Sequence, residues 1–140
     1  MNIVYTHQKI PTQPPEQEYG NKEYKIFLSP RMKKNKKKKR YPLLNMDNYI
    51  QNKSSQMLYR LIEGKGKAIY LLGIQDNGEI RGMNQEEMET TLENMSLMAE
   101  QIKAQIRIVR VYEGGRGFVC TVRIYLSPEK FYEKIVDSII

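Results

Sequence analysis

Few residues in this chain have the chemistry that catalysis or metal binding requires. The sequence has one histidine, His7, and one cysteine, Cys120. A nucleophilic triad needs a base beside its nucleophile, and a zinc site needs several His or Cys ligands. His7 stands in a polar, proline-containing leader. Cys120 stands between Val119 and Thr121 in an alternating stretch, which favours a small core residue over a nucleophile. The sequence therefore predicts neither a metal site nor His-dependent catalysis.

Two other patterns also fail to predict an enzyme. The stretch Gly64-Lys65-Gly66-Lys67 lacks the spacing and the Ser or Thr of a phosphate-binding loop, and it follows a helix pattern instead of preceding one. Metal-dependent nuclease chemistry needs converging carboxylates, and only Glu23, Asp76 and Glu79 stand near expected strand ends. We expect a non-enzyme with no catalytic residues, no cofactor and no small-molecule substrate.

The strongest pattern is a run of basic residues between positions 31 and 40. Eight cations and no acid occupy these ten positions, and removing them from the total of 23 leaves 15 cations against 16 acids. All of the net charge of +7 therefore lies in one segment of an otherwise neutral domain. The run consists of Arg31, Lys33, Lys34, Lys36, Lys37, Lys38, Lys39 and Arg40, with Met32 and Asn35 between them.

Clustered cations of this kind neutralise phosphates and bind nucleic acid without reading its sequence. Tyr41, which follows the run, could stack on a base. Arg116, in a glycine-rich turn, is a further candidate contact. A solvated loop or a nuclear import signal are the alternatives, since import receptors also read such clusters. Mutual repulsion of eight cations favours a polyanionic partner, and we expect RNA.

The elements that must position these residues follow from periodicity. Strands are expected at 23–28, 67–74, 79–82, 106–112 and 117–126. Helices are expected at 47–62, from Asn84 with Glu87 as a capping box, and from Pro128. The stripe Met88, Leu92, Met95, Met98 and Ile102 favours core packing. The order β-α-β-β-α-β-β-α predicts an α+β fold with a mixed, mainly antiparallel sheet and helices packed on one face.

The chain is expected to form one α/β domain, residues 23–140, with a basic loop at 30–42. Residues 1–22, with Pro11, Pro14 and Pro15 among polar residues, are expected to be a flexible N-terminal arm. No apolar run approaches the roughly 20 residues of a membrane span, and the N-terminus lacks the apolar stretch of a signal peptide. We expect a cytoplasmic protein without a membrane partner.

From Ser54 onward the chain resembles the N-terminal domain of the GTP-binding protein 1 and 2 family, which are translational GTPases. The resemblance covers about residues 54–125 and depends on short motifs. These are Arg60-Glu63-Gly64-Gly66 in the pattern R-x-x-E-G-x-G, Tyr70-Gly73, Asn77-Gly78 with Gly82-Met83, Glu86-Glu87-Met88, and Met98-Ala99-Glu100. Most of them are structural, so the resemblance implies a domain type and a link to translation, not an active site.

The resemblance implies the ribosome, with its rRNA and proteins, as partner. The family's GTPase domains would follow this segment, whereas the sequence stops at Ile140. A domain that reaches the ribosome without a GTPase would occupy a site and hold the ribosome inactive, as a hibernation factor does. With a composition rich in Lys, Asn and Ile, this suggests a similarity to the microsporidian dormancy factors.

A second resemblance leads to an alternative function. Glu23-Tyr24-Lys25, followed by a helix and then the strand and turn GIQDNGEIRG, is similar to the Schlafen-type AlbA-like domain. Some members of that group cleave RNA with several carboxylates. Only Glu23, Lys25 and Asp76 match here, so the alternative is an RNA-cleaving or RNA-binding domain with an incomplete carboxylate set.

Overall fold

The computed structural model describes residues 2–29, 33–34, 40–41, 46–114 and 117–139. Within these ranges no helix is long and apolar enough to cross a membrane. The elements, in chain order, are β1 (Asn2–Thr6), β2 (Lys22–Lys25), β3 (Lys33–Lys34), β4 (Arg40–Tyr41), α1 (Met46–Glu63), β5 (Lys67–Leu72), α2 (Gln85–Gln101), β6 (Gln105–Gly114), β7 (Gly117–Tyr125) and α3 (Pro128–Ile139).

Five of the strands form one mixed sheet in the order β1-β6-β7-β5-β2. β7 is the central strand and pairs antiparallel with both β6 and β5. The two edge pairings, β1 with β6 and β2 with β5, are parallel. The α+β class and the mixed, mainly antiparallel sheet are confirmed, because the two antiparallel ladders are longer than the two parallel ladders at the edges.

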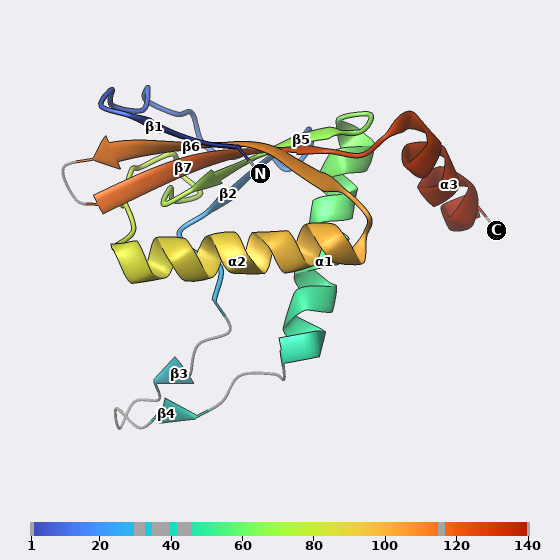
Figure 1. Ribbon diagram of the computed structural model, residues 1–140, viewed down its shortest axis with the longest axis horizontal. Helices are drawn as coiled ribbons and strands as arrows, with labels where there is room; N and C mark the ends of the chain where they lie inside the picture. Colours follow the sequence, from blue (N-terminus) through green and yellow to red (C-terminus); the bar gives the residue numbers. More distant parts are fainter. Residues whose placement is uncertain (1, 30–32, 35–39, 42–45, 115–116, 140) are drawn as a thin grey trace.

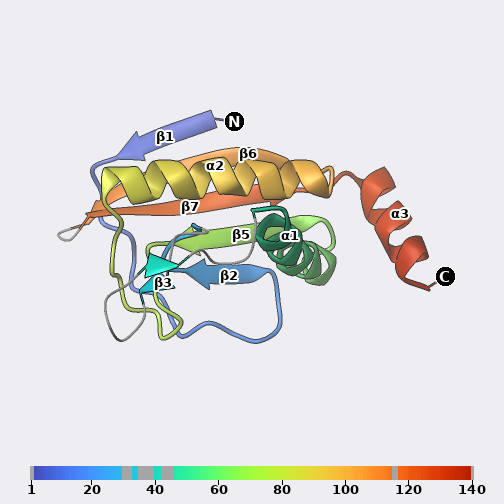
Figure 2. The same ribbon diagram turned by 90° about the horizontal axis from the view of Figure 1, so that it is seen from below.

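Helices α1 and α2 pack against the same face of this sheet, as the two views show (Figures 1 and 2). Alternate residues of β5, β6 and β7 face them, because successive side chains of a strand point to opposite faces. The sequence-predicted methionine stripe of α2 lies in this core, with Leu92 at its margin. Cys120 is buried there too, as expected for a small core residue.

The opposite face of the sheet is covered only in part. Residues between β1 and β2 cross it, and Ile10 packs there with Tyr24, Leu71, Ile74 and Val119 to form a second, smaller cluster. The Tyr24 hydroxyl donates a 2.9 Å hydrogen bond to the Pro14 carbonyl and holds this crossing segment down. Further along the same face the strands have no helix over them (Figure 1).

Two expected elements differ from the observed ones. Residues 1–22 were expected to carry no regular structure, but Asn2–Thr6 forms the edge strand β1. Its partner is β6, about 100 residues away in the chain, and local periodicity cannot reveal such a pairing. The expected return strand at 79–82 is reduced to an isolated bridge between Ile74 and Ile80.

The start of α2 follows the sequence prediction closely. The Asn84 Oδ1 atom accepts a 2.7 Å hydrogen bond from the Glu87 amide, and the Glu87 carboxylate accepts a 3.1 Å bond from the Asn84 amide. This reciprocal capping box satisfies two amides that the helix itself cannot pair.

Candidate nucleic-acid interface

The basic run is the interface that the sequence predicts, and the structure describes three of its residues and the tyrosine that follows it. Lys33–Lys34 and Arg40–Tyr41 form the short antiparallel pair β3–β4, with Lys33 opposite Tyr41 and Lys34 opposite Arg40. The backbone thus brings three predicted cations and the predicted stacking tyrosine together. The other predicted contacts, Arg31, Lys36, Lys37, Lys38, Lys39 and Arg116, lie outside the described residues.

The β3–β4 pair stands apart from the five-stranded sheet. It lies between β2 and α1 in the chain and is drawn on the helix side of the sheet, beyond the N-terminal end of α1 (Figure 1). The described residues of the run, Lys33, Lys34 and Arg40, thus lie outside the five-stranded sheet.

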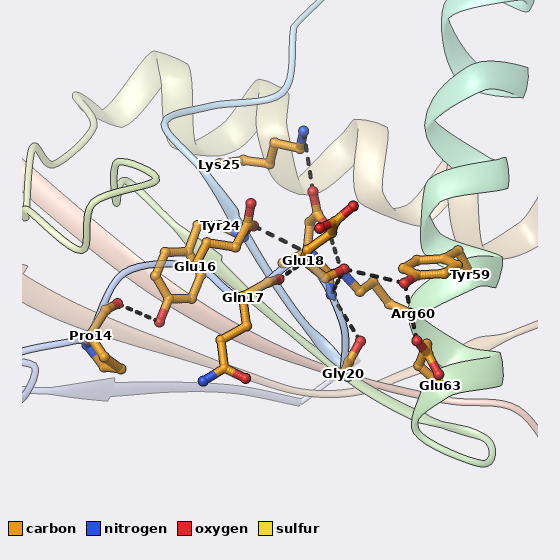
Figure 3. Close-up of polar contacts among 11 residues, drawn as sticks. Pro14, Glu16, Gln17, Glu18, Gly20, Tyr24, Lys25, Tyr59, Arg60 and Glu63 are labelled. Atoms are coloured by element: carbon orange, nitrogen blue, oxygen red, sulfur yellow. Dashed lines mark hydrogen bonds and ion pairs between the residues drawn. The ribbon is translucent and has the colours of Figure 1, made fainter.

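A second polar constellation, which the sequence did not predict, is built around Arg60 of α1. Its Nε atom lies 2.6 Å from the Glu23 carboxylate on β2. Its two terminal nitrogens donate to backbone carbonyls of the segment before β2, at 2.9 Å to Gly20, 3.1 Å to Gln17 and 3.3 Å to Glu18 (Figure 3). Arg60 is buried, so its charge is neutralised inside the protein.

Two acidic residues near Arg60, Glu16 and Glu23, also help to join α1 to β2 and to the segment before it. Glu16 lies 3.9 Å from the guanidinium and also accepts a hydrogen bond from the Tyr24 amide. Burial raises the pKa of Glu16, and the nearby Glu23 and Asp76 carboxylates raise that pKa further, against the lowering effects of the Tyr24 amide and Arg60. Lys25 pairs with Glu23 at 3.3 Å.

Two residues of the Schlafen-like alternative, Glu23 and Lys25, have side chains engaged in structural contacts, whereas Asp76 is exposed and makes its contact through the backbone. Glu23 is shared between Arg60 and Lys25, and the Asp76 carbonyl accepts a hydrogen bond from the Glu16 amide. Among the described residues, no three His, Cys, Asp or Glu side chains are grouped so that they could hold a metal ion. Cys120 is no better placed as a nucleophile, because burial raises its pKa to about 12.

Known proteins with similar sequences show the family to which this chain is related. The chain is 36% identical over 104 residues to GTP-binding protein 2 of Mus musculus and of Homo sapiens, a match that covers 74% of this chain. It is 34% identical over 80 residues, 56% of this chain, to GTP-binding protein 1 of Xenopus laevis. The chain is related to the GTP-binding protein 1 and 2 family. The matched region spans only 15% of GTP-binding protein 2 and 12% of GTP-binding protein 1. A scan of the chain against models of known protein families finds no match.

The motif that suggested the GTP-binding protein 1 and 2 family has a structural explanation here. In the pattern R-x-x-E-G-x-G, Arg60 ties the N-terminal segment to α1. A Cβ at Gly64 would lie 1.8 Å from the Lys67 carbonyl oxygen, and Gly66 has a φ of +98° that favours glycine. The sequence offered one signal for the role of Arg60: a cation three residues after Met57 and next to Leu61, on the border of an apolar stripe.

Proposed function

We propose that this chain is a non-catalytic factor that binds ribosomal RNA, occupies a functional site on the ribosome and holds it inactive. The observation that carries the proposal is the charge distribution. Ten residues contain all of the excess positive charge. The three of them that the structure describes, Lys33, Lys34 and Arg40, lie outside the five-stranded sheet. A cationic segment of this kind suits the phosphate backbone of RNA, where affinity depends on the number of neutralised phosphates.

The relation to the GTP-binding protein 1 and 2 family supports the ribosome as the source of that RNA. The resemblance of this region to translational GTPases connects the domain to translation. The 140 residues have no phosphate-binding loop. A domain without such a loop would fill a site on the ribosome without itself driving a GTP-dependent step, as a dormancy factor does. We place the protein in the cytoplasm with the ribosome.

Sedimentation of the purified protein with intact ribosomes through sucrose gradients tests the proposal. We expect the protein in the ribosomal or subunit fractions at low salt, and we expect added protein to reduce translation in a cell-free extract. A variant with Ser in place of the six lysines at 33, 34 and 36–39 should leave the ribosomal fractions. The control, Lys103→Gln with Lys134→Gln, should remain bound. Wild-type protein that stays at the top of the gradient would refute the proposal.

The Schlafen-like alternative makes a separate prediction. The observation that favours it is the proximity of three carboxylates, because Glu23 and Asp76 are both close enough to Glu16 to raise its pKa. Incubation with tRNA or rRNA and Mg²⁺ or Mn²⁺ distinguishes the two functions. We expect no cleavage. Cleavage that is lost in both Glu23→Gln and Asp76→Asn would favour the nuclease function instead.

A further inference from the structure

The uncovered part of the sheet carries a second concentration of positive charge. It lies on the face opposite α1 and α2, beyond the segment that packs around Ile10. The exposed cations on this face come from four strands, and the described strand positions that share the face include no Asp or Glu. The cations are Lys22 on β2, Lys67 on β5, Arg107 and Arg110 on β6, and Arg123 on β7.

The sheet register places these side chains next to one another. Arg123 is opposite Ile69 on one side and Ile108 on the other, and Ile69 is in turn opposite Lys22. Arg110 is two residues along from Ile108, so it is the diagonal neighbour of Arg123 at about 7–8 Å. Within the described residues neither arginine forms an ion pair with an acid. Two unpaired cations this close repel each other unless an anion lies near both.

An aromatic contact lies within the same group of cations. The register of β6 shifts between Ile106 and Ile108, and the intervening residue, Arg107, has its guanidinium 4.2 Å from the centre of the Tyr125 ring. Tyr125 alternates with the core residues Ile124 and Leu126, so it belongs to the open face. Arg107 is exposed, and a guanidinium that contacts a ring on one side can take a stacked base on the other.

We infer that this open face is a second RNA-binding surface, one that takes single-stranded RNA across β7 and β6, with phosphates at Arg110 and Arg123 and a base on Arg107. The inference deepens the proposed function and rests on it. Charge and aromatic contact together favour RNA over other polyanions, since cations combined with stacking groups are the usual means of binding single strands. The surface lies on the opposite side of the sheet from β3–β4 (Figure 1), so the protein contacts RNA on both sides.

The test uses the full chain and a labelled oligouridine of about 12 nucleotides, with affinity measured by fluorescence anisotropy over a range of salt concentrations. In Arg110→Gln with Arg123→Gln, loss of two phosphate contacts should flatten the slope of log affinity against log salt by about 1.4. Arg107→Lys retains the charge but loses the planar stack. It should weaken binding roughly fivefold or more while leaving the slope unchanged.

The matched control, Lys103→Gln with Lys134→Gln, removes one cation from the turn after α2 and one from α3. It should change the affinity and the salt slope only by the small amount that its lower net charge causes. All four substituted arginine and lysine sites of the two double variants lie outside the core, and an unchanged thermal midpoint confirms folding. If wild-type protein binds and only the lysine-run variant weakens it, the open-face inference is wrong and the proposed function stands. If wild-type protein binds neither ribosomes nor RNA, the proposed function fails. Binding to phosphatidylserine vesicles but not to oligouridine would overturn the RNA assignment of this face.

Discussion

At the residue scale, Arg60 and Glu23 form a buried ion pair that joins α1 to β2 and the segment before it. Removing Arg60 leaves the buried Glu23 carboxylate with Lys25, a partly exposed residue, as its ion-pair partner. Such changes typically cost about 3–5 kcal/mol. The carbonyls of Gln17 and Gly20 would lose their Arg60 donor in the same step, and the Glu18 carbonyl would keep the Tyr59 hydroxyl as a donor.

Arg60→Met should therefore lower the free energy of unfolding by about 3–5 kcal/mol, as measured by urea denaturation. The exposed Arg81→Met should change it by less than about 0.5 kcal/mol and serves as the control. A loss of similar size in both variants would mean that the Arg60 contacts contribute little.

Glu16 predicts a pH dependence whose sign follows from its raised pKa. Because the folded protein holds the Glu16 proton more tightly than the unfolded chain does, ionisation of this group costs folding free energy. Its stabilising effect is complete below the ordinary value of 4.5 and is lost as pH rises through the raised value. As the pH rises through this range, the free energy of unfolding of Glu16→Gln should increase relative to that of the wild type, because the variant has no carboxyl group to ionise at this position. Denaturant unfolding at a series of pH values measures the difference, and a constant difference across the series would contradict the assignment.

At the element scale, the capping box sets where α2 begins. Asn84→Ala removes the acceptor for the Glu87 amide and should cost about 1 kcal/mol. Asn84→Ser retains an acceptor and should cost much less. Thermal unfolding of the two variants compares them directly, and equal losses would show that the cap is not the cause.

The edge strand β1 offers a second test at this scale. Its residues pair with β6, although most of their side chains are exposed. Hydrogen exchange on the free protein should show protected amides within residues 2–6 and faster exchange at residues 7–9. Exchange at the unprotected rate throughout 2–9 would restore the sequence prediction of a flexible arm.

At the scale of the whole molecule, the basic run and the folded domain are separable. Replacing the six lysines of 33–39 with Ser should leave the thermal midpoint nearly unchanged, because lysine side chains are rarely part of an apolar core and Lys33 and Lys34 lie outside the five-stranded sheet. The slope of log RNA affinity against log salt should drop by roughly 4 to 5 if all six contact phosphate. An unchanged slope and affinity would show that the run is a solvated loop.

The amino-acid sequence by itself determined the parts of this protein that depend on local order. Periodicity located α1, α2 and the strands β5, β6 and β7, and the pair Asn84 and Glu87 located the start of a helix. Counting charges was enough to assign the net charge to residues 31–40. Each of these properties belongs to residues that are near one another in the chain.

Only the tertiary structure decided which distant residues meet. The pairing of β1 with β6, the capture of residues 16–23 by Arg60, and the group of cations on the open face all join segments far apart in sequence. Arg110 and Arg123 are ordinary strand residues until the antiparallel register makes them diagonal neighbours. Such arrangements depend on strand order and on which face the helices cover, and burial of the whole core sets both.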